Sequence, residues 1–167
     1  MSIRDILCWP DPRLRTVCAP VAEVTEDVRK LAADMLETMY AAPGRGLAAP
    51  QVGVLERLFV MDTSWKEAEP TPQVFINPLV SPIGDTHVSQ YEGCLSLPGI
   101  AVDVSRPDKV HLRWTDLEGR AQEAAFDGFA AACIQHEVDH LDGRVTLDHV
   151  DEERRASLIA QYQQAAT

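Results

Sequence analysis

The chain has 167 residues, enough for one domain with a sizeable core, so we expect a single domain over residues 1–167. A formal net charge of −11 argues against nucleic-acid binding through a basic face. No long apolar run or charged-then-apolar leader is present, which predicts a soluble, cytoplasmic protein without membrane contact.

The first predicted element is an amphipathic helix near residues 25–42, whose apolar residues recur at helical spacing. It leads into the small-residue segment Gly44-Arg45-Gly46-Leu47-Ala48-Ala49-Pro50-Gln51. Such a loop beside a pocket lets a substrate backbone lie against the protein backbone. Gln51 ends the loop with an amide that can donate to a carbonyl oxygen. A Gly-x-Gly loop is weak evidence alone, since many helices end in glycine turns.

A run of strands follows, and its last two members flank Leu117-Glu118-Gly119-Arg120, a hairpin signal. The predicted strands lie near 57–62, 73–81, 85–92, 100–105, 109–116 and 121–126. Strands in a run with helices at either end predict an α+β fold. We expect antiparallel β-sheets packed around a central helix, with an N-terminal helix and a C-terminal helix near 152–164.

Between two of these strands lies Glu92-Gly93-Cys94-Leu95-Ser96, which places a cysteine in an extended segment. Gly93 lets the backbone pass close to a metal, and the Leu95 N–H can point at a developing oxyanion. The Glu92 carboxylate can anchor a nearby arginine or loop. The ordinary alternative for Cys94 is a buried free cysteine in a sheet.

The helix predicted near 128–141 carries the most informative motif, His136-Glu137-Val138-Asp139-His140. Asp127 is a plausible N-cap and Gly143 a stop signal. Two histidines four residues apart share one helix face and can bind one metal ion, while Glu137 can accept a proton from metal-bound water. The alternative is a solvated helix with two surface histidines.

A catalytic metal needs a third protein ligand. Cys94 is the preferred candidate, because a thiolate from a strand can approach the helix face and complete a Cys-His-His set with an open fourth position. Cys133 lies on the same helix, but it is about 10 Å along the axis from His140, so we expect it to pack beside the site. His149 falls in a segment typical of surface and is interpreted as structural.

These three motifs, in this order, resemble those of peptide deformylases, and the resemblance extends from about Asp11 to about residue 150. It implies a catalytic domain that removes the N-formyl group from formyl-methionyl peptides or nascent chains and releases formate. The implied cofactor is Fe(II), with Zn, Ni or Co as substitutes.

Transferred to this sequence, the resemblance implies Cys94, His136 and His140 as metal ligands. Glu137 becomes the general base and acid. Gln51 and the Leu95 backbone amide become the oxyanion donors. The expected substrate-binding residues are Gly44, Arg45, Gly46, Gly93 and Cys133.

Three residues depart from the family pattern. Arg45 stands where the family has an aliphatic pocket residue, Gln90 replaces an apolar residue, and Ala101 stands near a usual arginine. Arg45 either narrows the pocket and contacts substrate, or its long stem turns the charge out to solvent. The changes put the preference at the first side chain in doubt.

The partners expected are the formylated peptide, including a ribosome-bound nascent chain, and no other subunit. The C-terminal tail has two arginines against three acids, which gives no support for ribosome docking through a basic helix. The alternative function is a silent or substrate-shifted paralogue that binds metal or peptide. The intact Cys94, Glu137 and Gln51 favour the active enzyme.

Overall fold

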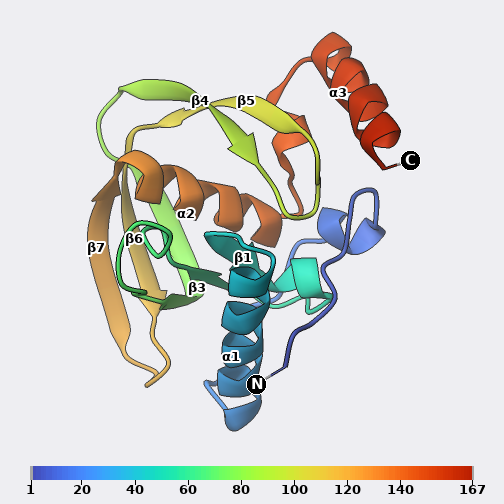
Figure 1. Ribbon diagram of the computed structural model, residues 1–167. Coiled ribbons are helices and arrows are strands. Elements are labelled where there is room, and N and C mark those ends of the chain that lie inside the picture. The colour runs from blue at the N-terminus through green and yellow to red at the C-terminus, as the bar shows by residue number, and fades with distance from the viewer. Residues whose placement is uncertain (1, 167) are drawn as a thin grey trace.

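The computed structural model describes residues 2–166, which form three α-helices and two antiparallel β-sheets (Figure 1). The helices are α1 (Glu26–Ala41), α2 (Gly128–Leu141) and α3 (Glu152–Ala165). The strands are β1 (Gly46–Ala48), β2 (Leu58–Met61), β3 (Gln73–Pro82), β4 (His87–Gly93), β5 (Ala101–Pro107), β6 (Lys109–Thr115) and β7 (Ala121–Asp127). The predicted α+β class is therefore confirmed.

The larger sheet has the strand order β1-β2-β3-β6-β7, and β4 and β5 form a separate two-stranded sheet. Helix α2 lies between the two sheets: it contacts all five strands of the larger sheet on one side and β5 on the other (Figure 1). This arrangement, anticipated from the order of the elements, brings segments from three parts of the chain to the middle of α2.

The apolar faces explain why these layers hold together. Ile134, Val138 and Leu141 of α2 pack onto Phe59 and Phe75 of the larger sheet, whose rings stack with centroids 4.7 Å apart. Strand β5 alternates buried and exposed residues, as expected for a strand with one face on the core. Its buried valines share a cluster with α3. Helix α3 buries Leu158 and Tyr162, as its spacing predicts.

Most element predictions lie within one or two residues of the observed bounds, and the predicted metal helix 128–141 coincides with α2. The prediction of a loop over residues 44–51 was wrong, because Gly46–Ala48 pairs with β2 as an edge strand and Ala49–Val52 forms a 3₁₀ turn. Asp127 lies at the N-cap position of α2, but its side chain makes no capping hydrogen bond. No helix in the described part of the chain combines the length and apolar character needed to cross a bilayer.

Candidate metal centre and active site

The two histidines of α2 lie one turn apart and face the β4–β5 sheet. The ring centroids of His136 and His140 are 5.0 Å apart, and His140 is almost fully buried. This follows from the helical repeat, which stacks residues four apart on one face. The alternative of two surface histidines on a solvated helix is wrong for this structure.

Cys94 enters the same space from the turn that follows β4. Its Sγ lies 3.4 Å from His140 Nε2, and one ligand atom each from Cys94, His136 and His140 lie within 4.8 Å of one another. A tetrahedral ion with bonds of 2.0–2.3 Å separates its ligands by roughly 3.5 Å. The spacing and the soft thiolate–imidazole donor set therefore fit a transition-metal ion.

The charges of this trio support the same interpretation. Burial alone raises the pKa of the Cys94 thiol, but His140 and His136 outweigh burial and hold that pKa well below its usual value. Burial lowers the pKa of His136, whereas Cys94 and Glu92 raise it overall. The protein therefore favours a thiolate at residue 94, the form that binds metals.

Glu137 lies beside the trio as a buried carboxylate. Its Oε2 has no hydrogen-bond partner among residues 2–166, and burial raises the pKa of the carboxyl group although His136 and His140 oppose that effect. An unpaired buried carboxylate oxygen is costly unless a ligand or water meets it. Glu137 also lines the pocket, so a small molecule there can reach it.

Gly46 is the backbone neighbour of this carboxylate. A Cβ built at residue 46 would lie 2.8 Å from Glu137 Oε1 and 2.9 Å from Cys133 Sγ. Only glycine lets β1 approach α2 this closely. Cys133 packs beside the site, as expected. It does not belong to the group of ligand atoms that Cys94, His136 and His140 form.

The side-chain amide of Gln51 is fixed at both ends. Its Oε1 accepts a hydrogen bond from the Ala48 N–H at 2.9 Å, and its Nε2 donates to Ser96 Oγ at 3.0 Å. The same Nε2 lies 3.8 Å from Cys94 Sγ. The buried Ser96 hydroxyl thus aims the amide at the cysteine turn, a role that the sequence analysis missed. Ser96 ends the motif that begins at Glu92, and this position was the sequence signal that could have revealed its role.

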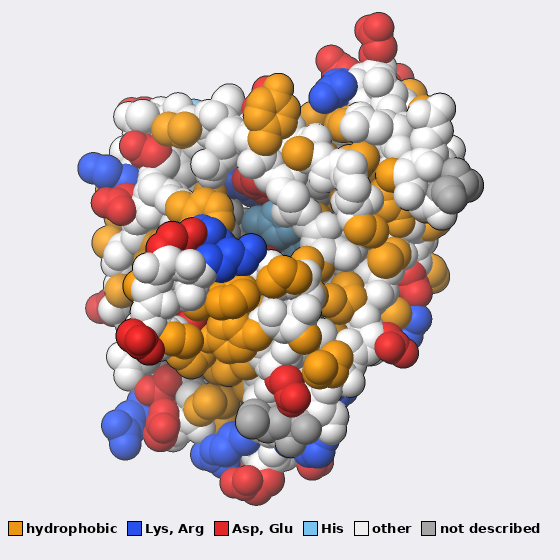
Figure 2. Space-filling view, viewed as in Figure 1, with side chains coloured by type: hydrophobic (Ala, Val, Ile, Leu, Met, Phe, Trp, Pro, Cys, Tyr) orange, Lys and Arg blue, Asp and Glu red, His pale blue; other side chains and the backbone are white. Residues whose placement is uncertain are grey.

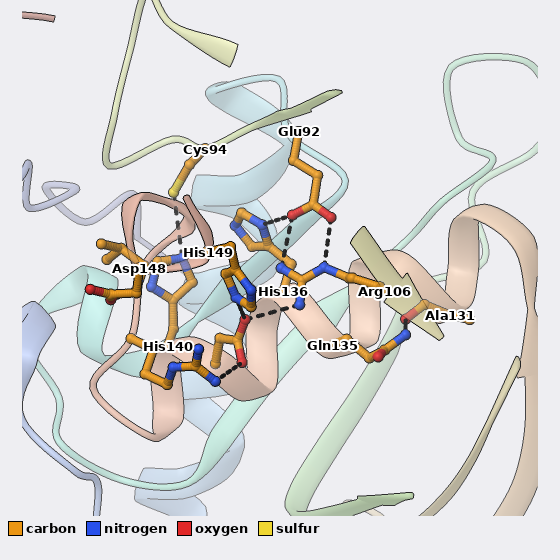
Figure 3. Close-up of polar contacts among 12 residues, drawn as sticks. Glu92, Cys94, Arg106, Ala131, Gln135, His136, His140, Asp148 and His149 are labelled. Carbon is orange, nitrogen blue, oxygen red and sulfur yellow. Dashed lines mark hydrogen bonds and ion pairs between the residues drawn. The ribbon is translucent and has the colours of Figure 1, made fainter. Parts of the chain in front are cut away.

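A chain of charged contacts supports the metal-facing histidine from behind (Figure 3). His136 Nδ1 donates to Glu92 at 2.9 Å, which leaves Nε2 for a ligand, and Glu92 accepts two hydrogen bonds from Arg106 at 2.6 and 2.9 Å. Arg106 also donates to Asp139 at 2.9 Å, and His149 lies 2.7 Å from the same carboxylate. The prediction that Glu92 anchors an arginine is confirmed.

The place of His149 and Arg106 in this chain was not predicted. His149 was interpreted as structural, and its contact with Asp139 agrees with that, but the expected surface position was wrong, because its side chain is only 17% exposed. Arg106 shares the buried face of β5 with Val102 and Val104. An arginine at a core position of an alternating strand needs an acidic partner, so this pattern was the missed signal.

Cys94 and His136 of the trio line a pocket of about 410 Å³, visible in Figure 2 as a hollow with a histidine at its base. All five predicted substrate-binding residues line it, together with Gln51, Leu95 and Gln90: they are Gly44, Arg45, Gly46, Gly93 and Cys133. Ala101 is exposed on β5 opposite Gly93 and does not line the pocket.

The side chain of Arg45 points neither fully into the pocket nor fully out to solvent. Its guanidinium donates to Glu67 at 2.5 Å and to the Thr63 carbonyl at 3.2 Å, and lies 5.3 Å from the centre of the Phe129 ring. Phe129, in the first turn of α2, is half exposed and lines the pocket. The side chain of Arg45 therefore forms part of the pocket rim.

The geometry agrees with comparisons to known proteins. Residues 3–156 match the family model described as Polypeptide deformylase. A peptide deformylase from Acinetobacter baumannii is 51% identical over 93% of this chain and 87% of its own length, and one from Rhodopseudomonas palustris is 47% identical over 99% and 96%.

Solved structures give the same result. A peptide deformylase from Legionella pneumophila superposes with a TM-score of 0.91 at 38% identity, covering 99% of this chain and 96% of that chain. The Ehrlichia chaffeensis peptide deformylase in complex with actinonin gives 0.92 at 36% identity, covering 99% and 98%. The chain belongs to the polypeptide deformylase family.

Proposed function

We propose that this chain is a peptide deformylase whose Cys94, His136 and His140 bind Fe(II), with Zn, Ni or Co as substitutes. It hydrolyses the formyl amide of N-formylmethionyl peptides to formate and a free amine. The observation that carries the proposal is the meeting of three metal-ligand atoms beside a buried, unpaired carboxylate oxygen of Glu137. The intact set gives no support to a silent relative.

A divalent ion held here would supply two effects, a lowered pKa for a water that it binds and polarisation of a carbonyl oxygen. Glu137 Oε2 accepts the proton of the attacking water, whose oxygen bonds to the formyl carbon. The carbon–nitrogen bond then breaks, and Glu137 returns its proton to the leaving amine. The raised pKa of Glu137 suits both acts, because a carboxyl group whose pKa is nearer to neutral pH takes up and releases a proton more readily there.

The negative charge on the formyl oxygen needs hydrogen-bond donors. We assign this role to Gln51 Nε2, which lies 3.8 Å from Cys94 Sγ, and to the N–H of Leu95, the residue after Cys94; both residues line the pocket. The loss of one such donor typically raises the barrier by about 2.7–4 kcal/mol. The bond to Ser96 holds the Gln51 amide in place before substrate arrives.

The peptide itself has a backbone surface available. Strand β1 pairs only with β2, so its other edge offers main-chain groups to an extended peptide. Gly44 and Gly46 flank Arg45 on this side, and Gly93 ends β4 across the pocket. We propose that these residues, with Cys133 in the pocket lining, form the binding surface for the formylated peptide.

The wider assignments are part of the proposal. One catalytic domain over residues 1–167 works as a cytoplasmic monomer and meets its substrate on ribosome-bound nascent chains. With a formal net charge of −11, it reaches these chains without binding ribosomal RNA directly.

Formate release from formyl-Met-Ala-Ser, measured with protein loaded anaerobically with Fe(II), tests the function. Wild type should release formate, whereas Glu137→Ala should lose at least about a thousandfold in kcat with its metal retained. Cys94→Ser should lose metal as measured by elemental analysis. A wild type no faster than Glu137→Ala would overturn the assignment of Glu137.

A further inference from the structure

The charged side chains at the pocket have unequal access to solvent. Glu92 is bound by Arg106 and His136 and is only 9% exposed, and Glu137 is buried. The remaining charged residues that line the pocket are Arg45 and Lys66, both at its mouth. The blue patch at the edge of the hollow in Figure 2 marks cationic side chains there.

This cationic mouth contrasts with the chain as a whole, which carries a formal net charge of −11. Glu67 neutralises Arg45 only in part, since it is 62% exposed and does not line the pocket. An ion pair to so exposed a carboxylate is worth about 0–1 kcal/mol, so a competing carboxylate can replace it. The stack on Phe129 keeps the guanidinium at the rim while the partner changes.

We propose that Arg45, assisted by Lys66, makes this deformylase prefer peptides with an acidic side chain at the second or third residue, after the formylated methionine. The preference rests on the function proposed above and deepens it. A guanidinium has five N–H donors, of which Glu67 and Thr63 take two, so donors remain for a substrate carboxylate. The interaction forms away from the formyl group, so it changes KM and leaves kcat unaffected.

The test compares C-terminally amidated peptides, because a free C-terminus could reach the same guanidinium and imitate an acidic side chain. Formyl-Met-Asp-Ser-amide and formyl-Met-Ala-Asp-amide are each paired with the isosteric asparagine peptide. At low salt the better of the two acidic peptides should have a KM about fivefold lower than its neutral partner, with equal kcat. The difference should shrink at 0.5 M salt, where the Debye length is below about 5 Å.

Three variants identify the group responsible. Arg45→Met should abolish the difference in KM between the acidic peptide and its neutral partner, each measured with this same variant, whereas Glu67→Gln should widen it by freeing Arg45. Arg113→Met, an equal charge change at an exposed position on β6, should leave the difference intact. Formate from both peptides with equal KM, or a preference that survives Arg45→Met, would overturn the inference and leave the deformylase activity standing. No formate from any peptide would refute the proposed function itself.

Discussion

At Gly46, the absence of a side chain directly determines where a reacting group can lie. Its missing side chain is the space that Glu137 and Cys133 occupy. Gly46→Ala should therefore push the carboxylate out of position, and we expect kcat/KM to fall by about a hundredfold, the usual cost of an ångström-scale displacement. Steady-state kinetics with metal content as a control would measure it. Gly84→Ala introduces local backbone strain, because Gly84 has a φ of 72°, but it should leave the site unchanged, because nothing lies within 4 Å of the added Cβ. An equal loss of activity in both variants would contradict the explanation.

Arg106 holds two carboxylates that belong to different layers, Glu92 of β4 and Asp139 of α2. Arg106→Met should remove the cation that these two largely buried carboxylates share, which leaves Glu92 with His136 and Asp139 with His149 as nearest partners, and should lower the free energy of unfolding by about 3–5 kcal/mol. It should also weaken metal binding, since Glu92 orients His136. Urea unfolding and metal competition would report the two effects, with the exposed Arg113→Met as the matched control. Unchanged metal affinity would show that Glu92 orients the ring without Arg106.

At the scale of elements, Asp34 ties α1 to the N-terminal segment. Its carboxylate is buried and accepts from the Ser2 N–H at 2.8 Å, and it contacts Arg4 at 3.0 Å and Lys30 at 3.1 Å. Burial raises its pKa, but these partners outweigh burial and lower it from 3.8 to about 2. A lowered folded-state pKa stabilises the protein above the unfolded-state value, and that stability disappears as pH falls from about 4 to about 2.

Asp34→Asn should therefore be less stable than wild type at pH 6, and the difference should shrink between pH 4 and pH 2. Taking the difference in the free energy of unfolding between the two metal-free proteins cancels groups that titrate alike in both. Thermal or urea unfolding at each pH would provide it. A difference that stays constant down to pH 2 would show that Asp34 does not carry the ionisation.

Much of this element level could be predicted from sequence. Helix α2 has apolar spacing, a local motif and a glycine stop signal at Gly143 that agree, so its bounds followed directly. Strand β1 could not, because Gly-Leu-Ala has little intrinsic preference for a strand and its pairing with β2 is a tertiary contact. The irregular register between Ile76 and Leu79 is equally non-local, and there Asn77 adopts a φ of 51° while its side chain bonds both backbone groups of Val21.

The candidate site divides along the same line. Ligand types and spacings are local properties of sequence, and the trio they predicted does come together. The partners that support it depend on which segments become neighbours after folding. No local pattern reveals that Glu67, from the connection between β2 and β3, meets Arg45, or that His149 meets Asp139.

At the scale of the whole molecule, the metal trio links the turn after β4 of the two-stranded sheet to α2, the helix that packs on the larger sheet. Removal of the ion by a chelator should lower the melting temperature, because a ligand that binds only the folded state stabilises it. Amide exchange should rise most around residues 94–97, while the β3–β6–β7 part of the larger sheet stays protected. Exchange measured by mass spectrometry with and without metal would reveal this. A uniform rise across both sheets would contradict a local role for the ion.

If the substrate peptide adds to β1 as proposed above, the shortness of this strand limits how many substrate residues can pair with it. A three-residue edge can form ladder bonds with only about as many residues of an added strand. Whatever follows those residues meets no main-chain template at this edge. A tripeptide and a full-length protein would then offer this edge nearly the same few residues, so the length of the remaining polypeptide should matter little for binding at β1.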